Sequence, residues 1–158
     1  MQAQQFVGGN YAASKAGLTG LSGAATTMTT AAAILFAIGG KAFSKAAIAA
    51  GATPTVDAVT GAAITLATGK GTNILWCLDA AGNVRLVQGS VENVDASGKF
   101  AVAPPQFANL PDTLAPFAYS IHTNTGAAFT IGVSLWNQAG ATHAVQDILT
   151  VPSRPQLA

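Results

Sequence analysis

The alternation of apolar and polar positions is clearest between Asn73 and Val91. Residues 74–78 form an almost continuous apolar run, ILWCL, whereas residues 84–88 alternate between two faces. The connector 79–83 contains Asp, Gly and Asn, which tolerate the backbone angles of a tight turn. This pattern predicts a β-hairpin whose first strand is buried on both faces and whose loop is formed by residues 79–83.

A second pair of alternating segments follows later in the chain. Residues 117–123 place Phe117, Tyr119 and Ile121 on one face, and residues 128–136 alternate in the same way. The intervening Asn-Thr-Gly is typical of a hairpin turn, so these segments predict a second hairpin. A last strand is expected over residues 145–151.

The region 24–50 is ambiguous in its local preferences. Its alanines favour helix, whereas its threonines, its Ile-Leu-Phe run and its paired glycines favour strands that meet at a bend. We expect two strands, at 25–38 and 41–48, in place of helices. Four prolines within residues 104–116 predict an irregular loop there, with one helical turn near 110–114.

Many short strands with frequent turns predict a mainly-β fold. The expected architecture is an antiparallel β-sandwich or barrel with little helix. The chain has 158 residues, which suits a single domain. Residues 1–23 are predicted to be an extended N-terminal arm, and residues 24–158 a β-rich domain ending in a short Pro-containing tail. The residues expected to anchor this arm on a partner are its large apolar side chains: Phe6, Val7, Tyr11, Leu18 and Leu21.

The charge of the chain is unusually low. Hydrophobic residues make up 50% of the sequence and charged residues only 8%, with a net charge of +1, against about 25% charged residues in an average domain. Such a surface favours coverage by partners or by copies of the same chain, so a trimer or dimer is expected; the other interpretation is a small-residue monomer. The seven basic residues are spread singly, which argues against nucleic-acid binding.

Nothing in the sequence predicts a membrane protein or a secreted one. The apolar run 31–38 is too short to cross a bilayer, which needs about 20 residues. The N-terminus lacks a basic leader followed by an apolar segment.

The sequence contains no recognisable catalytic motif. His122 and His143 are the only histidines; we place the first on the polar face of a strand and the second in a loop, as solvated or structural residues. The single Cys77 excludes an internal disulfide and a cysteine-based zinc site, and is expected to be a buried, inert thiol. Trp76 and Trp136 are expected to be core or interface anchors. We therefore predict no enzyme activity, no cofactor and no metal.

Five stretches together resemble a family of small virion proteins of tailed bacteriophages, encoded among the head genes. The resemblance covers roughly residues 18–156, and none of its stretches is a catalytic signature. It implies a structural protein of the capsid exterior, of the decoration or cement type, which is made in the host cytoplasm and binds the major capsid protein as a β-rich dimer or trimer. The stretches are GGKAFSKAA (39–47), GATPTVDAVTGAAIT (51–65), LDAAGNVRLVQGSV (78–91), PQFANLPDTLAPFAYSI (105–121) and QDILTVPSRPQ (146–156).

Two other functions stay open at this point. A tail or fibre component would also be structural and would differ only in its location. A carbohydrate-binding β-sandwich or hydrolase domain would need a groove lined by Trp76 or Trp136 with carboxylates nearby.

Overall fold

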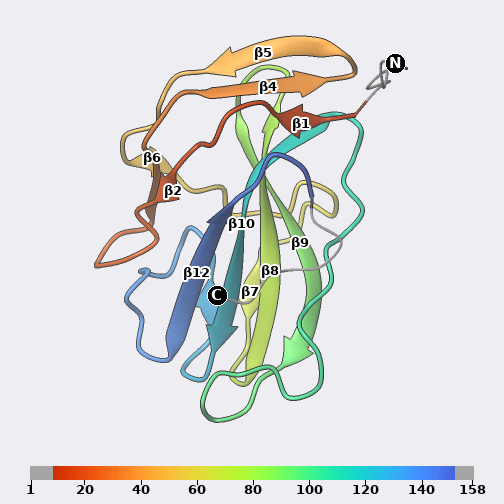
Figure 1. Cartoon of the computed structure of the whole chain (residues 1–158). Helices are drawn as coiled ribbons and strands as arrows, with labels where there is room; N and C mark the ends of the chain where they lie inside the picture. Colours follow the sequence, from red (N-terminus) through yellow and green to blue (C-terminus); the bar gives the residue numbers. More distant parts are fainter. Residues whose placement is uncertain (1–8, 152–158) are drawn as a thin grey trace.

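The computed structural model describes residues 9–151. Within this range all regular structure is β, in twelve strands without a helix, which confirms the mainly-β prediction. None of the described residues forms a helix that could span a membrane. The largest sheet has four antiparallel strands (Figure 1) in the order β12-β10-β8-β9. Its strands are β8 (Lys70–Asp79), β9 (Val84–Asn93), β10 (Leu114–Asn124) and β12 (Ala141–Asp147).

The predicted hairpin at the centre of the chain is confirmed as β8 and β9. Asp79 closes its loop, because its Oδ1 accepts hydrogen bonds from the amides of Ala81 (3.0 Å) and Asn83 (2.9 Å). Its Oδ2 forms an ion pair with Arg85 at 3.0 Å. Trp76 is completely buried, as expected for a strand covered on both faces.

The predicted second hairpin is wrong. β10 pairs with β8 on one side and with β12 on the other, so residues 128–136 are not its partner. They contribute only the short β11 (Phe129–Thr130), which pairs with β7 (Thr65–Leu66). The chain then turns, because the amides of Val133 and Ser134 both bond to the carbonyl of Thr130. The last strand accordingly begins earlier than predicted, at Ala141 in place of residue 145.

Pro116 lies inside β10, although the prolines of 104–116 were expected to stay outside any ladder. The register between β10 and β8 shifts between Pro116 and Ala118, and such a bulge accommodates a residue that has no amide donor. Because of this shift, Phe117 and Ala118 both pack into the hydrophobic cluster on one face of the main sheet. Tyr119 packs into a second cluster on the other face. The prediction that Phe117 shares a face with Tyr119 and Ile121 is therefore wrong.

The region 24–50 forms strands and no helix, as predicted, but the strands are shorter. The expected strand 25–38 is interrupted at residues 31–33, and the second expected strand ends at Lys45. These strands lie across one end of the main sheet (Figure 1) in two small sheets, ordered β1-β4-β5 and β2-β3-β6. Their strands are β1 (Tyr11–Ala12), β2 (Leu18–Thr19), β3 (Thr27–Thr30), β4 (Ile34–Ile38), β5 (Lys41–Lys45) and β6 (Gly51–Ala52).

The prediction of an independent arm over residues 1–23 is wrong for residues 9–23. Tyr11 lies in β1, which pairs with β4, and Leu18 lies in β2, which pairs with β3. Leu18 and Leu21 are buried within the chain itself. The carboxylate of Asp147 accepts hydrogen bonds from the amides of residues 17 and 18 at 3.0 and 3.1 Å, which ties β2 to β12. Phe6 and Val7 lie outside the described residues.

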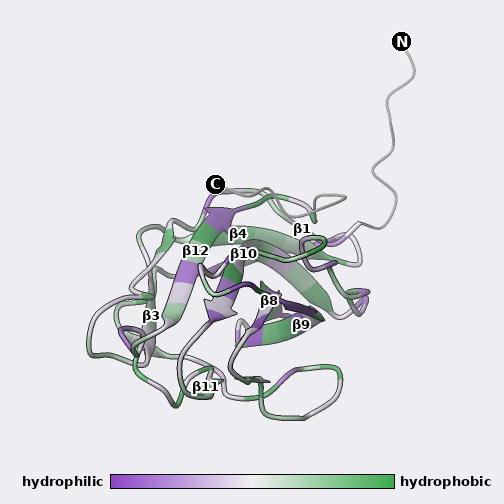
Figure 2. Ribbon diagram, turned by 90° about the horizontal axis from the view of Figure 1, so that it is seen from below, coloured by the Kyte–Doolittle hydropathy of each residue, from purple (hydrophilic) through white to green (hydrophobic). Residues whose placement is uncertain are grey.

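The main sheet separates two hydrophobic clusters. One face packs Trp76, Phe117 and Trp136 against Leu18, Leu21 and the small sheets. The other face, around Cys77 and Tyr119, is covered by side chains of the loop 100–110. β12 is an edge strand whose residues alternate between half-buried and exposed, and its ribbon alternates in hydropathy in Figure 2.

Candidate functional site: a buried histidine pair

The two histidines of the chain are direct partners across the seam between β10 and β12. His122 pairs with His143 in the strand register, and their Nδ1 atoms lie 2.7 Å apart. His122 is completely buried, and His143 is half-buried. The predicted solvated face for His122 and the predicted loop for His143 are therefore wrong, because β10 is a central strand and β12 begins before His143. A structural role for the histidines, which the sequence left open, agrees with this burial.

Hydrogen bonds extend from the histidine pair in both directions. Ser120 Oγ lies 2.5 Å from His122 Nε2, and the indole Nε1 of Trp76 donates to the same Oγ at 2.7 Å. On the other side, His143 Nε2 lies 3.0 Å from the carbonyl oxygen of Trp136. One chain of hydrogen bonds thus connects β8, β10, β12 and the segment that precedes β12.

The groups at the two ends of the hydrogen-bond chain determine which atom carries each proton. The indole of Trp76 can only donate, so Ser120 Oγ accepts from it and gives its own proton to His122 Nε2. The carbonyl of Trp136 can only accept, so His143 carries its proton on Nε2 and accepts at Nδ1. His122 then donates from Nδ1. Both imidazoles are neutral in this arrangement, and every donor has an acceptor.

Aromatic rings surround the pair. The ring centroid of Trp136 lies 6.0 Å from that of His122 and 5.0 Å from that of His143. Phe129 lies 4.9 Å from His143. The indole nitrogen of Trp136 donates to the carbonyl of Thr27 at 2.8 Å, which fixes the ring against β3. The histidines therefore sit in an apolar enclosure that disfavours a positive charge.

This environment lowers the pKa of both histidines. Burial holds the pKa of His122 well below its usual range, and the neighbouring His143 lowers it further. Burial also lowers the pKa of His143, although the hydrogen bond to the carbonyl of Trp136 opposes that shift. At neutral pH both side chains are uncharged, in agreement with the proton assignment.

Ser120 and His122 have the pairing that nucleophilic catalysis uses, but not its access. A nucleophile must reach its substrate, whereas Ser120 and His122 are both completely buried. The Oγ of Ser120 is also occupied by the Trp76 donor. The arrangement can therefore hold strands together, and the group that reaches the surface is His143.

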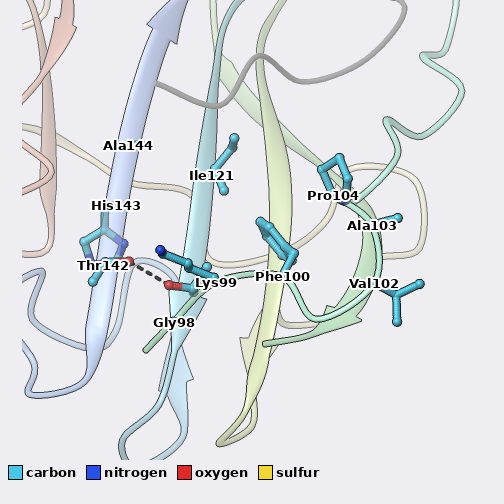
Figure 3. Close-up of a pocket in the computed structure, with 11 residues that line it drawn as sticks. Gly98, Lys99, Phe100, Val102, Ala103, Pro104, Ile121, Thr142, His143 and Ala144 are labelled. Carbon is cyan, nitrogen blue, oxygen red and sulfur yellow. Dashed lines mark hydrogen bonds between the residues drawn. The ribbon is translucent and has the colours of Figure 1, made fainter. Parts of the chain in front are cut away.

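His143 borders an open concavity of about 550 Å³. Figure 3 shows this concavity between the loop 98–104 and residues of β10 and β12. Thr142 bonds Thr123 across the two strands at 2.7 Å, on the face opposite the histidine pair. The lining is mainly apolar, and its described residues include no carboxylate; they are Gly98, Lys99, Phe100, Val102, Ala103, Pro104, Ile121, Thr123, Thr142, His143 and Ala144.

The predicted anchor residues do not form one site. Leu18 and Leu21 are in the core, whereas Tyr11 borders a separate shallow groove with Leu149. Trp76 and Trp136 are buried, so neither lines the groove that a carbohydrate-binding domain would need. Among the described residues, no group of three or more His, Cys, Asp or Glu side chains is placed to hold a metal ion.

Sequence reasoning missed the histidine pair because it assigned β10 the wrong partner. The only signal in the sequence was that both histidines are flanked by β-prone residues. Comparison with protein-family models, with curated proteins and with solved structures found no match for this chain.

Proposed function

We propose that this chain is a non-enzymatic structural protein of a bacteriophage particle, which decorates and stabilises the capsid exterior. It acts through contacts with the major capsid protein and with other copies of itself, as a trimer or dimer. The proposal rests on the resemblance of residues 18–156 to small virion proteins of tailed phages and on the character of the surface.

The observation that carries the proposal is an apolar, weakly charged surface. Only 8% of the residues are charged, and several large aliphatic side chains project into solvent; Val102 is 95% exposed and Val133 63%. Exposed apolar side chains of this kind are typical of surfaces that partners bury. Within residues 9–151, the exposed large aliphatic residues are Leu35, Val56, Val59, Val91, Val102, Val133, Leu135 and Leu149.

These side chains lie on different parts of the molecule. Leu35 belongs to β4, at one end of the main sheet, whereas Val102 belongs to the loop at the opposite end (Figure 1). A single small interface does not reach both ends. Contacts with more than one neighbour do, and a decoration protein has such neighbours in the capsid surface and in sister subunits.

The test combines the oligomeric state of the protein in solution with its binding to phage particles. Light scattering of the purified protein should give a dimer or trimer at micromolar concentration, and the protein should co-sediment with undecorated phage heads. Val102→Asp and Leu35→Asp, at exposed positions, should weaken assembly or particle binding without lowering the melting temperature. A stable monomer that leaves the heads undecorated would refute the proposal.

Electron microscopy of the particles separates the head from the tail. Density for this chain on the capsid exterior is the expected result, and density on the tail or a fibre would replace the decoration role with the alternative structural one. A glycan array provides the check on carbohydrate binding, for which we expect no signal because both tryptophans are buried.

A further inference from the structure

The hydrogen-bond chain described above tolerates no additional proton. His143 Nδ1 must accept the proton that His122 carries. If His143 gains a proton on Nδ1, two N–H groups face one another at 2.7 Å and the bond must break. If His122 instead moved its proton to Nε2 and donated to Ser120 Oγ, the Ser120 hydroxyl would lose the acceptor that it has now, so the network would still lose a hydrogen bond.

No neighbouring charge offsets a proton on this pair. Among the described residues, none of the hydrogen-bond or ring partners of the two imidazoles is charged. The charged groups on the adjacent strands are engaged elsewhere. On β8, Lys70 bonds Asn93 and Asp79 pairs with Arg85; on β12, Asp147 binds the amides of residues 17 and 18.

The two ends of the β10–β12 seam are held in different ways. Asp147 and the bond from the amide of Ile148 to the carbonyl of Phe117 hold the end of β12 that lies against β2. At the other end, the amide of Thr125 bonds the carbonyl of Gly140, and residues 141–145 form the edge of the sheet, held to β10 by the ladder, by the histidine pair and by the Thr123–Thr142 bond. His143 is only half-buried, so water reaches this edge.

We propose that the His122–His143 pair is an acid-sensitive latch on the edge strand β12. A proton from solvent binds Nδ1 of His143 and forms an imidazolium, the bond to His122 breaks, and residues 141–145 separate from β10. The β8–β9 hairpin and the anchored end at Asp147 stay in place. The latch is independent of the proposed role in a virion, since it concerns only this chain.

Hydrogen exchange measured by mass spectrometry on the full-length protein tests the latch. After correction for intrinsic exchange rates, protection of residues 141–145 should fall at least tenfold between pH 7.5 and pH 5.0. Residues 74–78 in β8 exchange only when the core opens, and the core loses the same protonation-linked stability, so the comparison rests on absolute protection: at pH 5.0 these residues should stay at least tenfold more protected than residues 141–145. Equal protection of 141–145 at both pH values would overturn the proposal, and so would protection in β8 as low as that of 141–145 at pH 5.0, which would indicate global unfolding.

Two variants isolate the titrating group. His143→Gln keeps a neutral donor and acceptor but has no proton to gain, so its protection at 141–145 should not depend on pH. Thr142→Val removes the hydrogen bond to Thr123 on the opposite face and should keep the full pH response. A pH response that persists in His143→Gln would refute the latch. If His143→Gln does not fold, the comparison of the two segments in the unmodified protein decides the question alone.

Discussion

The Nδ1 atoms of His122 and His143 lie 2.7 Å apart across the β10–β12 seam, so only one of the two can carry a proton at that contact. The carbonyl of Trp136 and the indole of Trp76 decide which one it is, because each fixes the role of the group it meets. With the protons placed in this way, the hydrogen bond between the two histidines joins β10 to β12 as long as both imidazoles remain neutral.

The stability of the fold should therefore rise with pH through the histidine range. Both histidines have a pKa in the folded state below the unfolded value of about 6.5. Their contribution is full above that value and is lost as pH falls below it, because the unfolded chain then binds protons that the folded chain does not. Each histidine contributes a slope of up to about 1.4 kcal/mol per pH unit.

Urea unfolding at pH values from 5 to 8 measures this effect. The carboxylates with lowered pKa, including Asp57 and Asp79, start from 3.8, so their stabilising contribution is lost only at still lower pH and does not overlap the window of 5 to 6.5. A free energy of unfolding that is flat or increases toward pH 5 would contradict the neutral-pair assignment.

Trp76 should be sensitive to both its size and its indole nitrogen. Trp76→Ala should destabilise the fold by about 3–5 kcal/mol, the usual cost of removing a large core aromatic. Trp76→Phe keeps much of the volume but leaves Ser120 Oγ without its donor, and should cost about 1–3 kcal/mol. Urea midpoints of the two variants give the comparison, and an unchanged midpoint for Trp76→Ala would contradict the burial of this side chain.

The sequence predicted local pairings better than distant ones. The β8–β9 hairpin was predictable because its strands are neighbours in the chain and Asp79 closes the loop between them. The β10–β12 pairing was not, because residues 128–136 have a strand-like alternation that tertiary structure overrides with turns after Thr130. The buried histidine pair depends on that long-range pairing, so no local pattern could reveal it.

The dependence on contacts between segments distant in the sequence also explains the wrong prediction for residues 9–23. Their Gly-rich composition suggests an arm, yet two short strands there complete the hydrogen bonding of β3 and β4. Leu18 and Leu21 then fill one side of the core. Burial of this kind depends on partners more than 100 residues away, as the bonds from the amides of residues 17 and 18 to Asp147 show.

Cys77 should be unreactive in the folded protein. It is completely buried in β8, and burial raises the pKa of its thiol far above the ordinary value. Since the thiolate is the reactive form, Ellman's reagent should label no thiol under native conditions and one thiol per chain in strong denaturant. Rapid labelling of the native protein would mean that β8 opens readily.

Gly89 should not tolerate a side chain. A Cβ at this position would overlap the Asn73 side chain and the carbonyl oxygen of Gln106. The side-chain amide of Asn73 donates to the carbonyl of Pro105 at 2.9 Å, so the Asn73 side chain cannot move away freely. Gly89→Ala should cost about 1–3 kcal/mol, as overpacking usually does. Gly9→Ala, where the Cβ meets no atom within 4 Å, is the matched control and should leave the thermal midpoint unchanged.

The N-terminal residues should divide into two parts with opposite behaviour on truncation. Deleting residues 2–23 removes β1, β2 and the buried Leu18 and Leu21. Each large side chain lost from the core costs about 1.5–3 kcal/mol before cavities are counted, and the exposed edges of β3 and β4 add to this. Total stability of a domain is only about 5–15 kcal/mol, so this truncated protein should lack a cooperative thermal transition in circular dichroism.

Deleting residues 2–8 tests attachment separately from folding, because none of the core residues identified above is lost. This variant should melt within a few degrees of the full-length protein. If Phe6 and Val7 anchor the chain on a particle, it should also bind undecorated phage heads less tightly. Unchanged binding would place the attachment site on the exposed aliphatic residues, and Val102 and Leu35 would be tested next. A cooperative transition in the variant that lacks residues 2–23 would show that β1 and β2 are dispensable, and would support the prediction of an independent arm over residues 1–23.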